Sequence, residues 1–170
     1  MKALILPLLL AAAPALAGTG WEGRSAAFFG IHFIDTSTEG AVNGPRADEA
    51  ARVAMLDQYI AEGLVAGGLT LVDLGPASER IAAVKNPEHC AGCDGEIARG
   101  LGADYSIVAE VQKVSNLILA INIYVRDAAT GAQIRGQAVD IRGNTDDSWR
   151  RGARYILRNN IFKEPAPPAP

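Results

Sequence analysis

The stretch that decides the fold is DYSIVAEVQKVSNLILAINIYVRDAATGAQIRGQAVDIRG, residues 104–143. Apolar and polar residues alternate over 104–114 and again over 117–127, and this period of two is typical of β-strands with one buried face. The turn AATG (128–131) carries a glycine where a hairpin needs positive φ, so 133–143 is expected to return antiparallel. In the second strand the residues expected to share the buried face are Leu117, Leu119, Ile121, Ile123 and Val125.

The residues before this stretch predict alternating strands and helices. Short apolar runs at 25–33 and 69–74 indicate two strands, with a polar loop after the first. A helix is expected from Ala47 to the glycine pair 67–68, and shorter helices over 76–84 and 94–101. A last helix is expected to be capped by Asn144 or Thr145 and to pack through Trp149, Ala153, Ile156 and Leu157. This order predicts a single α/β (α+β) domain, with a mixed five-stranded sheet and helices packed across it.

The two ends of the chain differ in composition from the sequence between them. Residues 1–17 have a basic residue, an apolar run and a small-residue triplet ending at Ala17, which is the layout of a secretory signal. We therefore expect export to the periplasm, a domain over 18–162, and a Pro-rich disordered tail at 163–170. Removal of Lys2 changes the formal net charge from −3 to −4. A negative net charge argues against nucleic-acid binding. We also expect no membrane-spanning segment in the mature chain.

Several stretches resemble an uncharacterised family of exported proteobacterial proteins that is catalogued as a domain of unknown function. They are IDTSTEGAVNGPRADE (34–49), CAGCDGEIARGLGADY (90–105), VQKVSNLILAINIYVRDAATG (111–131) and DIRGNTDDSW (140–149). The resemblance implies an accessory role beside periplasmic quinoprotein alcohol (methanol) oxidation systems. The element order is also similar to the N-terminal domain of TolB and to CsgG-like periplasmic domains, which implies a binding or assembly module.

Cys90 and Cys93 are the only cysteines, and an oxidising compartment favours a disulfide between them. A four-residue loop gains only about 2 kcal/mol from such a bond, so its expected role is local. A thiol–disulfide couple is the alternative, because Cys93 lies near a helix N-terminus, although nearby carboxylates disfavour the thiolate. Haem attachment is excluded because Asp94 stands where a histidine is required. Zinc is disfavoured because His32 and His89 are the only other soft ligands.

The last helix carries four arginines, Arg150, Arg151, Arg154 and Arg158, with no acid between Asp147 and Glu164. One interpretation is a solvated face whose charge complements the helix dipole. The other is a docking surface for an acidic protein partner. Residues expected to extend that surface on the strands are Lys113, Asn116, Asn122, Tyr124 and Arg126.

Two oxygen-rich loops, at 35–39 and 144–147, could line a shared polar site if the fold brings them to one end of the sheet. Neither has the spacing of a calcium-binding hand, and turn formation or helix capping is the simpler role for each. We found no motif for a catalytic nucleophile, a phosphate loop or a dinucleotide. The favoured function is therefore a non-enzymatic accessory or binding protein without cofactor or metal. The alternatives are a thiol–disulfide redox protein and a carrier of a small ligand or metal ion.

Overall fold

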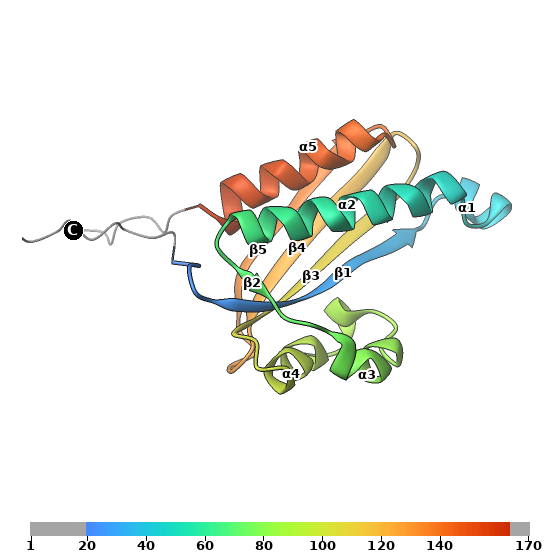
Figure 1. The fold of residues 1–170 in the computed structure, drawn as a ribbon. Coiled ribbons are helices and arrows are strands. Elements are labelled where there is room, and N and C mark those ends of the chain that lie inside the picture. Colours follow the sequence, from blue (N-terminus) through green and yellow to red (C-terminus); the bar gives the residue numbers. More distant parts are fainter. Residues whose placement is uncertain (1–19, 164–170) are drawn as a thin grey trace, which may run out of the picture.

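The computed structural model describes residues 20–163, which form one domain on a five-stranded mixed sheet (Figure 1). The strand order is β2–β1–β3–β4–β5. β1 pairs in parallel with β2 and β3, whereas β3, β4 and β5 form an antiparallel meander. The strands are β1 (Ser25–Asp35), β2 (Thr70–Leu71), β3 (Tyr105–Lys113), β4 (Ile118–Asp127) and β5 (Gln133–Arg142). The fold class expected from the sequence is confirmed.

Helices cover both faces of this sheet, as Figure 1 shows. The long helices α2 and α5 lie on one face, called here the α2/α5 face, and the short helices α3 and α4 lie on the other, the α3/α4 face. The α-helices are α1 (Thr38–Asn43), α2 (Ala47–Ala66), α3 (Ser78–Ala82), α4 (Cys93–Gly100) and α5 (Asp146–Ile156). Shorter turns are η1 (Gly75–Ala77) and η2 (Pro87–His89), and a π-helical turn η3 (Leu157–Ile161) extends α5. Within the described part of the chain, no helix has the length and apolar character needed to cross a membrane.

The main core lies between the sheet and the α2/α5 face. Alternate β4 residues from Leu119 to Val125 are completely buried there, and Ile107 and Ala109 of β3 join them. The packing residues predicted for the last helix, 149, 153, 156 and 157, are all buried in the same core. Leu117 is a correction, because 73 % of it is exposed. It lies in the β3–β4 turn, just before β4 begins, so strand alternation does not yet apply to it.

Two elements differ from the sequence-based expectation. β2 has two residues rather than six, although the backbone N–H of Val72 still donates to Ala26 at 3.0 Å. The loop after β1 contains the short helix α1, whose first turn is capped by the Ser37 side chain. The last helix continues through η3 to residue 161. The predicted leader at 1–17 lies outside the described residues, and so does the predicted tail at 163–170 except for its first residue.

Candidate functional site

The predicted arginine surface lies on the outer side of α5. Thr145 and Ser148 form a capping box that starts this helix, and Asp146 and Asp147 in its first turn complement the dipole. Arg150, Arg151, Arg154 and Arg158 are all exposed. The opposite side of α5 is buried in the main core, so the four arginines lie on the solvent-exposed side of the helix.

Three of these arginines have no carboxylate partner among residues 20–163. Arg151 forms an exposed ion pair with Asp147 at 3.4 Å, whereas Arg150, Arg154 and Arg158 form none with any described residue. Tyr155 is 52 % exposed and stands between them. Together with Asn159, three of the arginines and Tyr155 line a surface hollow of about 490 Å³. The α5 surface, defined as Arg150, Arg151, Arg154, Tyr155 and Arg158, is thus basic and partly aromatic.

The N-terminal end of α5 is held in place by polar contacts with α2. The Trp149 indole is fully buried, and its Nε1 donates to Asn144 Oδ1 at 3.1 Å. Arg52 of α2 donates to the same oxygen at 2.9 Å, pairs with Asp146 at 3.0 Å, and lies 5.6 Å from the Trp149 ring centroid. A cation–π contact and charge-assisted hydrogen bonds therefore fix the rotation of α5 about its axis.

Lys113 does not belong to this surface, and its predicted surface position is corrected. The side chain has no exposed area, and its Nζ lies 2.6 Å from Glu49 Oε1 and 3.2 Å from Asp35 Oδ2. Glu39 approaches to 3.5 Å, and Asn144 Nδ2 donates to Glu49 at 2.7 Å. A buried ammonium needs such partners, because moving an unpaired charge out of water has a large free-energy cost.

This Lys113 cluster is where the two oxygen-rich loops meet. Asp35 and Glu39 come from the first loop and Asn144 from the second, so the fold does bring the two loops together. The lysine ammonium occupies the centre of the shared polar site. Burial works against the charge of Lys113, but hydrogen bonds and charge from Glu49 and Asp35 raise its pKa above the ordinary value. Burial likewise works to raise the pKa of Asp35, and hydrogen bonds from Ser37 and Lys113 bring it below the ordinary value.

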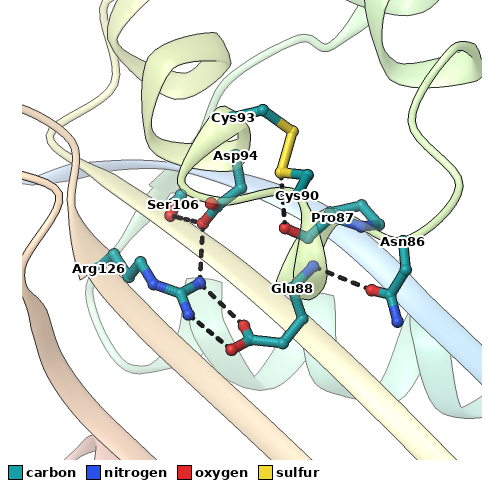
Figure 2. Close-up of a disulfide and its surroundings, with 8 residues drawn as sticks. All are labelled: Asn86, Pro87, Glu88, Cys90, Cys93, Asp94, Ser106 and Arg126. Carbon is teal, nitrogen blue, oxygen red and sulfur yellow. Dashed lines mark hydrogen bonds and ion pairs between the residues drawn. A yellow bond between two sulfur atoms is a disulfide. The ribbon is translucent and has the colours of Figure 1, made fainter.

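Arg126 lies on the other face of the sheet, so it does not extend the α5 surface. Its guanidinium holds both oxygens of Glu88, at 2.6 and 2.8 Å, and also Asp94 Oδ2 at 3.1 Å (Figure 2). Ser106 donates to the same Asp94 oxygen at 2.6 Å. Hydrogen bonding to Glu88 is the main cause that raises the pKa of Arg126. Asn122 is four residues before Arg126 in β4 and therefore faces the same side.

Asn116, the remaining strand residue predicted for the surface, lies in the β3–β4 turn. Its amide nitrogen donates to Glu39, and its oxygen accepts from Asn144 Nδ2 at 3.2 Å. Asn116 therefore ties the turn to α1 and to the Lys113 cluster. Tyr124, on the α3/α4 face, is partly buried, and this burial together with Glu110 and Glu88 raises its pKa.

The structure joins Cys90 and Cys93 in a disulfide at the start of α4 (Figure 2). Glu88 lies before the disulfide and Asp94 directly after it, and both carboxylates bind Arg126. Asp94 has no exposed area, and one of its oxygens, Oδ1, has no hydrogen-bond partner in the described structure. The disulfide closes the turn that brings these two carboxylates onto one guanidinium.

The two histidines lie beside the disulfide. His32 and His89 line a cavity of about 570 Å³ together with the cystine, and His89 Nε2 is 3.6 Å from the buried carboxylate of Glu110. Asn86 donates to the same Glu110 oxygen at 2.8 Å. In residues 20–163, no three His, Cys, Asp or Glu side chains form a group that could hold a metal ion.

Sequence reasoning did not identify Tyr155 as part of the surface. The available signal was its position four residues after Arg151 and three before Arg158, which places it on the same side of a helix as both. Glu88 is one of the carboxylates near the cysteines that disfavour a thiolate. Nothing local in the sequence pairs it with Arg126, which is 38 residues away.

Comparisons with known proteins identify a family and a fold. The family model DUF3280, described as "Protein of unknown function (DUF2380)", matches residues 24–161. No curated protein matches the chain. The C-terminal domain of LpoB from Salmonella enterica is similar in structure, with a TM-score of 0.50 and 18 % identity over 72 % of this chain and 84 % of that chain.

Two further solved structures are similar at lower scores. The PelC dodecamer from Paraburkholderia phytofirmans has a TM-score of 0.46 and 13 % identity over 86 % of this chain and 92 % of that chain. TolB from Acinetobacter baumannii has a TM-score of 0.42 and 8 % identity over 80 % of this chain and 28 % of that chain. At these identities the likeness concerns the fold alone.

Proposed function

We propose, starting from the fact that this chain belongs to the DUF3280 family, that it is an exported, non-enzymatic accessory protein that binds an acidic segment of a partner protein. Export rests on the leader-like residues 1–17. The binding role rests on the α5 surface.

The observation that carries the proposal is the set of unpaired cations on α5. Arg150, Arg154 and Arg158 have no ion-pair partner in residues 20–163, and Tyr155 is exposed among them. Arginine and tyrosine are over-represented among the residues that dominate binding energy at protein interfaces. A basic surface also accelerates encounter with an acidic partner and disfavours basic ones.

The test is a paired charge reversal on α5. Arg150→Glu with Arg154→Glu should abolish capture of the partner from a periplasmic extract of the native host, with an unchanged circular dichroism spectrum. The matched control is Arg80→Glu with Arg99→Glu, which makes the same charge change at exposed positions on α3 and α4. Loss of capture in both doubles would indicate net charge rather than a specific surface. Retained capture by the α5 double would refute the proposal.

The finer part of the proposal concerns the system that the protein serves. The family resemblance of residues 34–49, 90–105, 111–131 and 140–149 supports a partner within a periplasmic quinoprotein alcohol (methanol) oxidation system. The same capture experiment tests it, because the captured protein is identified by mass spectrometry. The captured protein is expected to be a quinoprotein dehydrogenase or its cytochrome. Capture of an unrelated acidic protein would support binding by the α5 surface but refute the link to alcohol oxidation.

We further propose that the cystine is a structural clamp rather than a redox couple. The support is its position between Glu88 and Asp94, both of which bind Arg126. Reduction would free the turn and loosen a bidentate ion pair that is only slightly exposed. In addition, Asp94 and Glu96 in the first turn of α4 disfavour a thiolate at Cys93.

A further inference from the structure

An apolar groove lies directly beside the α5 surface, between α2 and the end of α5. It has a volume of about 500 Å³. Its walls include the side chains of Tyr59 and Phe162, and Arg154 and Arg158 stand along its rim. The same two arginines also line the hollow around Tyr155. The groove and the basic surface therefore share residues and form one continuous face.

Two glycines of α2 set the form of this groove. A Cβ on Gly63 would lie 2.7 Å from Leu157 Cδ1, and a Cβ on Gly67 would overlap the ring of Phe162. These positions let Leu157 and Phe162 pack against the helix backbone. Phe162 is further fixed by an edge contact with Trp21, whose ring centroid is 6.2 Å away, and it remains only partly buried. The aromatic wall of the groove is thus held before any partner arrives.

The chemistry of the lining specifies what the groove can accept. Tyr59 and Phe162 offer ring faces and edges, which favour an aromatic side chain over an aliphatic one. Guanidinium groups at the rim add cation–π attraction to an aromatic ring and charge attraction to neighbouring carboxylates. The one acidic lining residue, Glu62, accepts a hydrogen bond from Gln58 at 2.8 Å.

We infer that the groove receives an aromatic anchor from the acidic partner segment, so that the recognised motif is an aromatic residue flanked by Asp or Glu. This inference rests on the proposed function and makes it more specific. The arginines select the flanking carboxylates, and the groove selects the aromatic side chain. A few anchor residues, most often Trp, Tyr or Arg, carry most of the binding energy at protein interfaces.

The test uses two labelled peptides, acetyl-EDEWEDE-amide and acetyl-EDEAEDE-amide, and the full-length exported protein, with binding read by fluorescence polarisation. We expect the tryptophan peptide to bind at least tenfold more tightly. Ala66→Phe should reduce that preference to less than twofold, because Ala66 is an exposed lining residue and the added ring fills the groove. Val65→Phe is the matched control, since Val65 is 55 % exposed and does not line the groove.

The outcomes separate this inference from the proposed function. Equal binding of the two peptides by the wild-type protein, or an undiminished preference in Ala66→Phe, would overturn the aromatic anchor. Arg150→Glu with Arg154→Glu should weaken both peptides at least tenfold. If that variant binds both as well as the wild type, or if the wild type binds neither, the acidic-segment function itself is wrong.

Discussion

Replacing Lys113 with methionine tests the buried charge cluster. Methionine matches the length of the lysine stem but removes the ammonium, which leaves Glu49 with only the Asn144 amide at 2.7 Å. Glu49 is almost completely buried, whereas Asp35 and Glu39 keep some contact with water. Removing one partner of a buried ion pair typically costs about 3–5 kcal/mol, because the other charge stays buried without compensation. That is a large part of the about 5–15 kcal/mol that stabilises a typical domain.

The assay is urea unfolding followed by circular dichroism, with Lys85→Met as the control because Lys85 is exposed. We expect an unchanged m-value and a loss of about 3–5 kcal/mol for Lys113→Met, against less than about 0.5 for the control. The double variant Lys113→Met with Glu49→Gln should be more stable, by at least about 1 kcal/mol, than the sum of the two single losses predicts. The reason is that the double variant no longer buries an unpaired Glu49 carboxylate. A loss for Lys113→Met within about 1 kcal/mol of the control would refute the reasoning.

The pH dependence of this loss has a definite sign. The pKa of Lys113 is raised, so the stabilisation from its ammonium is complete below the ordinary value of 10.5 and is lost as the pH rises through the folded value. The pKa of Asp35 is lowered, so its contribution is complete above 3.8 and is lost as the pH falls through the folded value. The difference in unfolding free energy between wild type and Lys113→Met should therefore be greatest between pH 3.8 and pH 10.5. It should become smaller as the pH falls below 3.8.

Three further predictions concern other parts of the fold. Cys90→Ser with Cys93→Ser should lower the unfolding free energy, measured in urea, by about 2 kcal/mol. The native disulfide should have a reduction potential below about −300 mV, and a potential near −200 mV would instead favour redox cycling. Gly152→Ala should lower the melting temperature, because the new Cβ would lie 2.7 Å from Ile141 Cγ2. This clash should outweigh the gain of about 1 kcal/mol in helix propensity. A raised melting temperature would contradict this prediction. Burial is the main cause that raises the pKa of Asp57, so its stabilising effect is complete below pH 3.8 and is lost as the pH rises. Asp57→Asn should therefore gain stability relative to wild type between pH 4 and 7, and the opposite trend in urea titrations would refute it.

The sheet could be predicted from the sequence because its signal is local. Alternation from Leu119 to Val125 identifies the buried face of β4 directly, and the glycine at 131, with φ of 74°, fixes the hairpin that follows. The short elements could not be predicted in this way. β2 pairs through only two residues and α1 has only six, so neither extends far enough to show a period.

The candidate site was predictable only on the helix. Arg150 and Arg154 follow the helical period, and their exposure could be expected from it. Lys113 and Arg126 were expected to be exposed because they are charged and sit on strands with one polar face. Their partners, Glu49 and Glu88, are 64 and 38 residues away, and only the packing of α2 and η2 against the sheet brings them together. A strand pattern shows which residues share a face but not what covers it.

The helix dipole does not account for the arginines on α5. Arg150 and Arg151 are the fifth and sixth of its eleven residues, and η3 continues the helix to residue 161, so Arg158 alone lies near the true C-terminal end. Dipole compensation acts only within the last turn. Arginines four apart on one side, such as Arg150 and Arg154, also repel each other by about 0.2–0.5 kcal/mol per pair. Because folding gains little from this arrangement, the arginines support the proposal that the α5 surface binds an acidic partner segment.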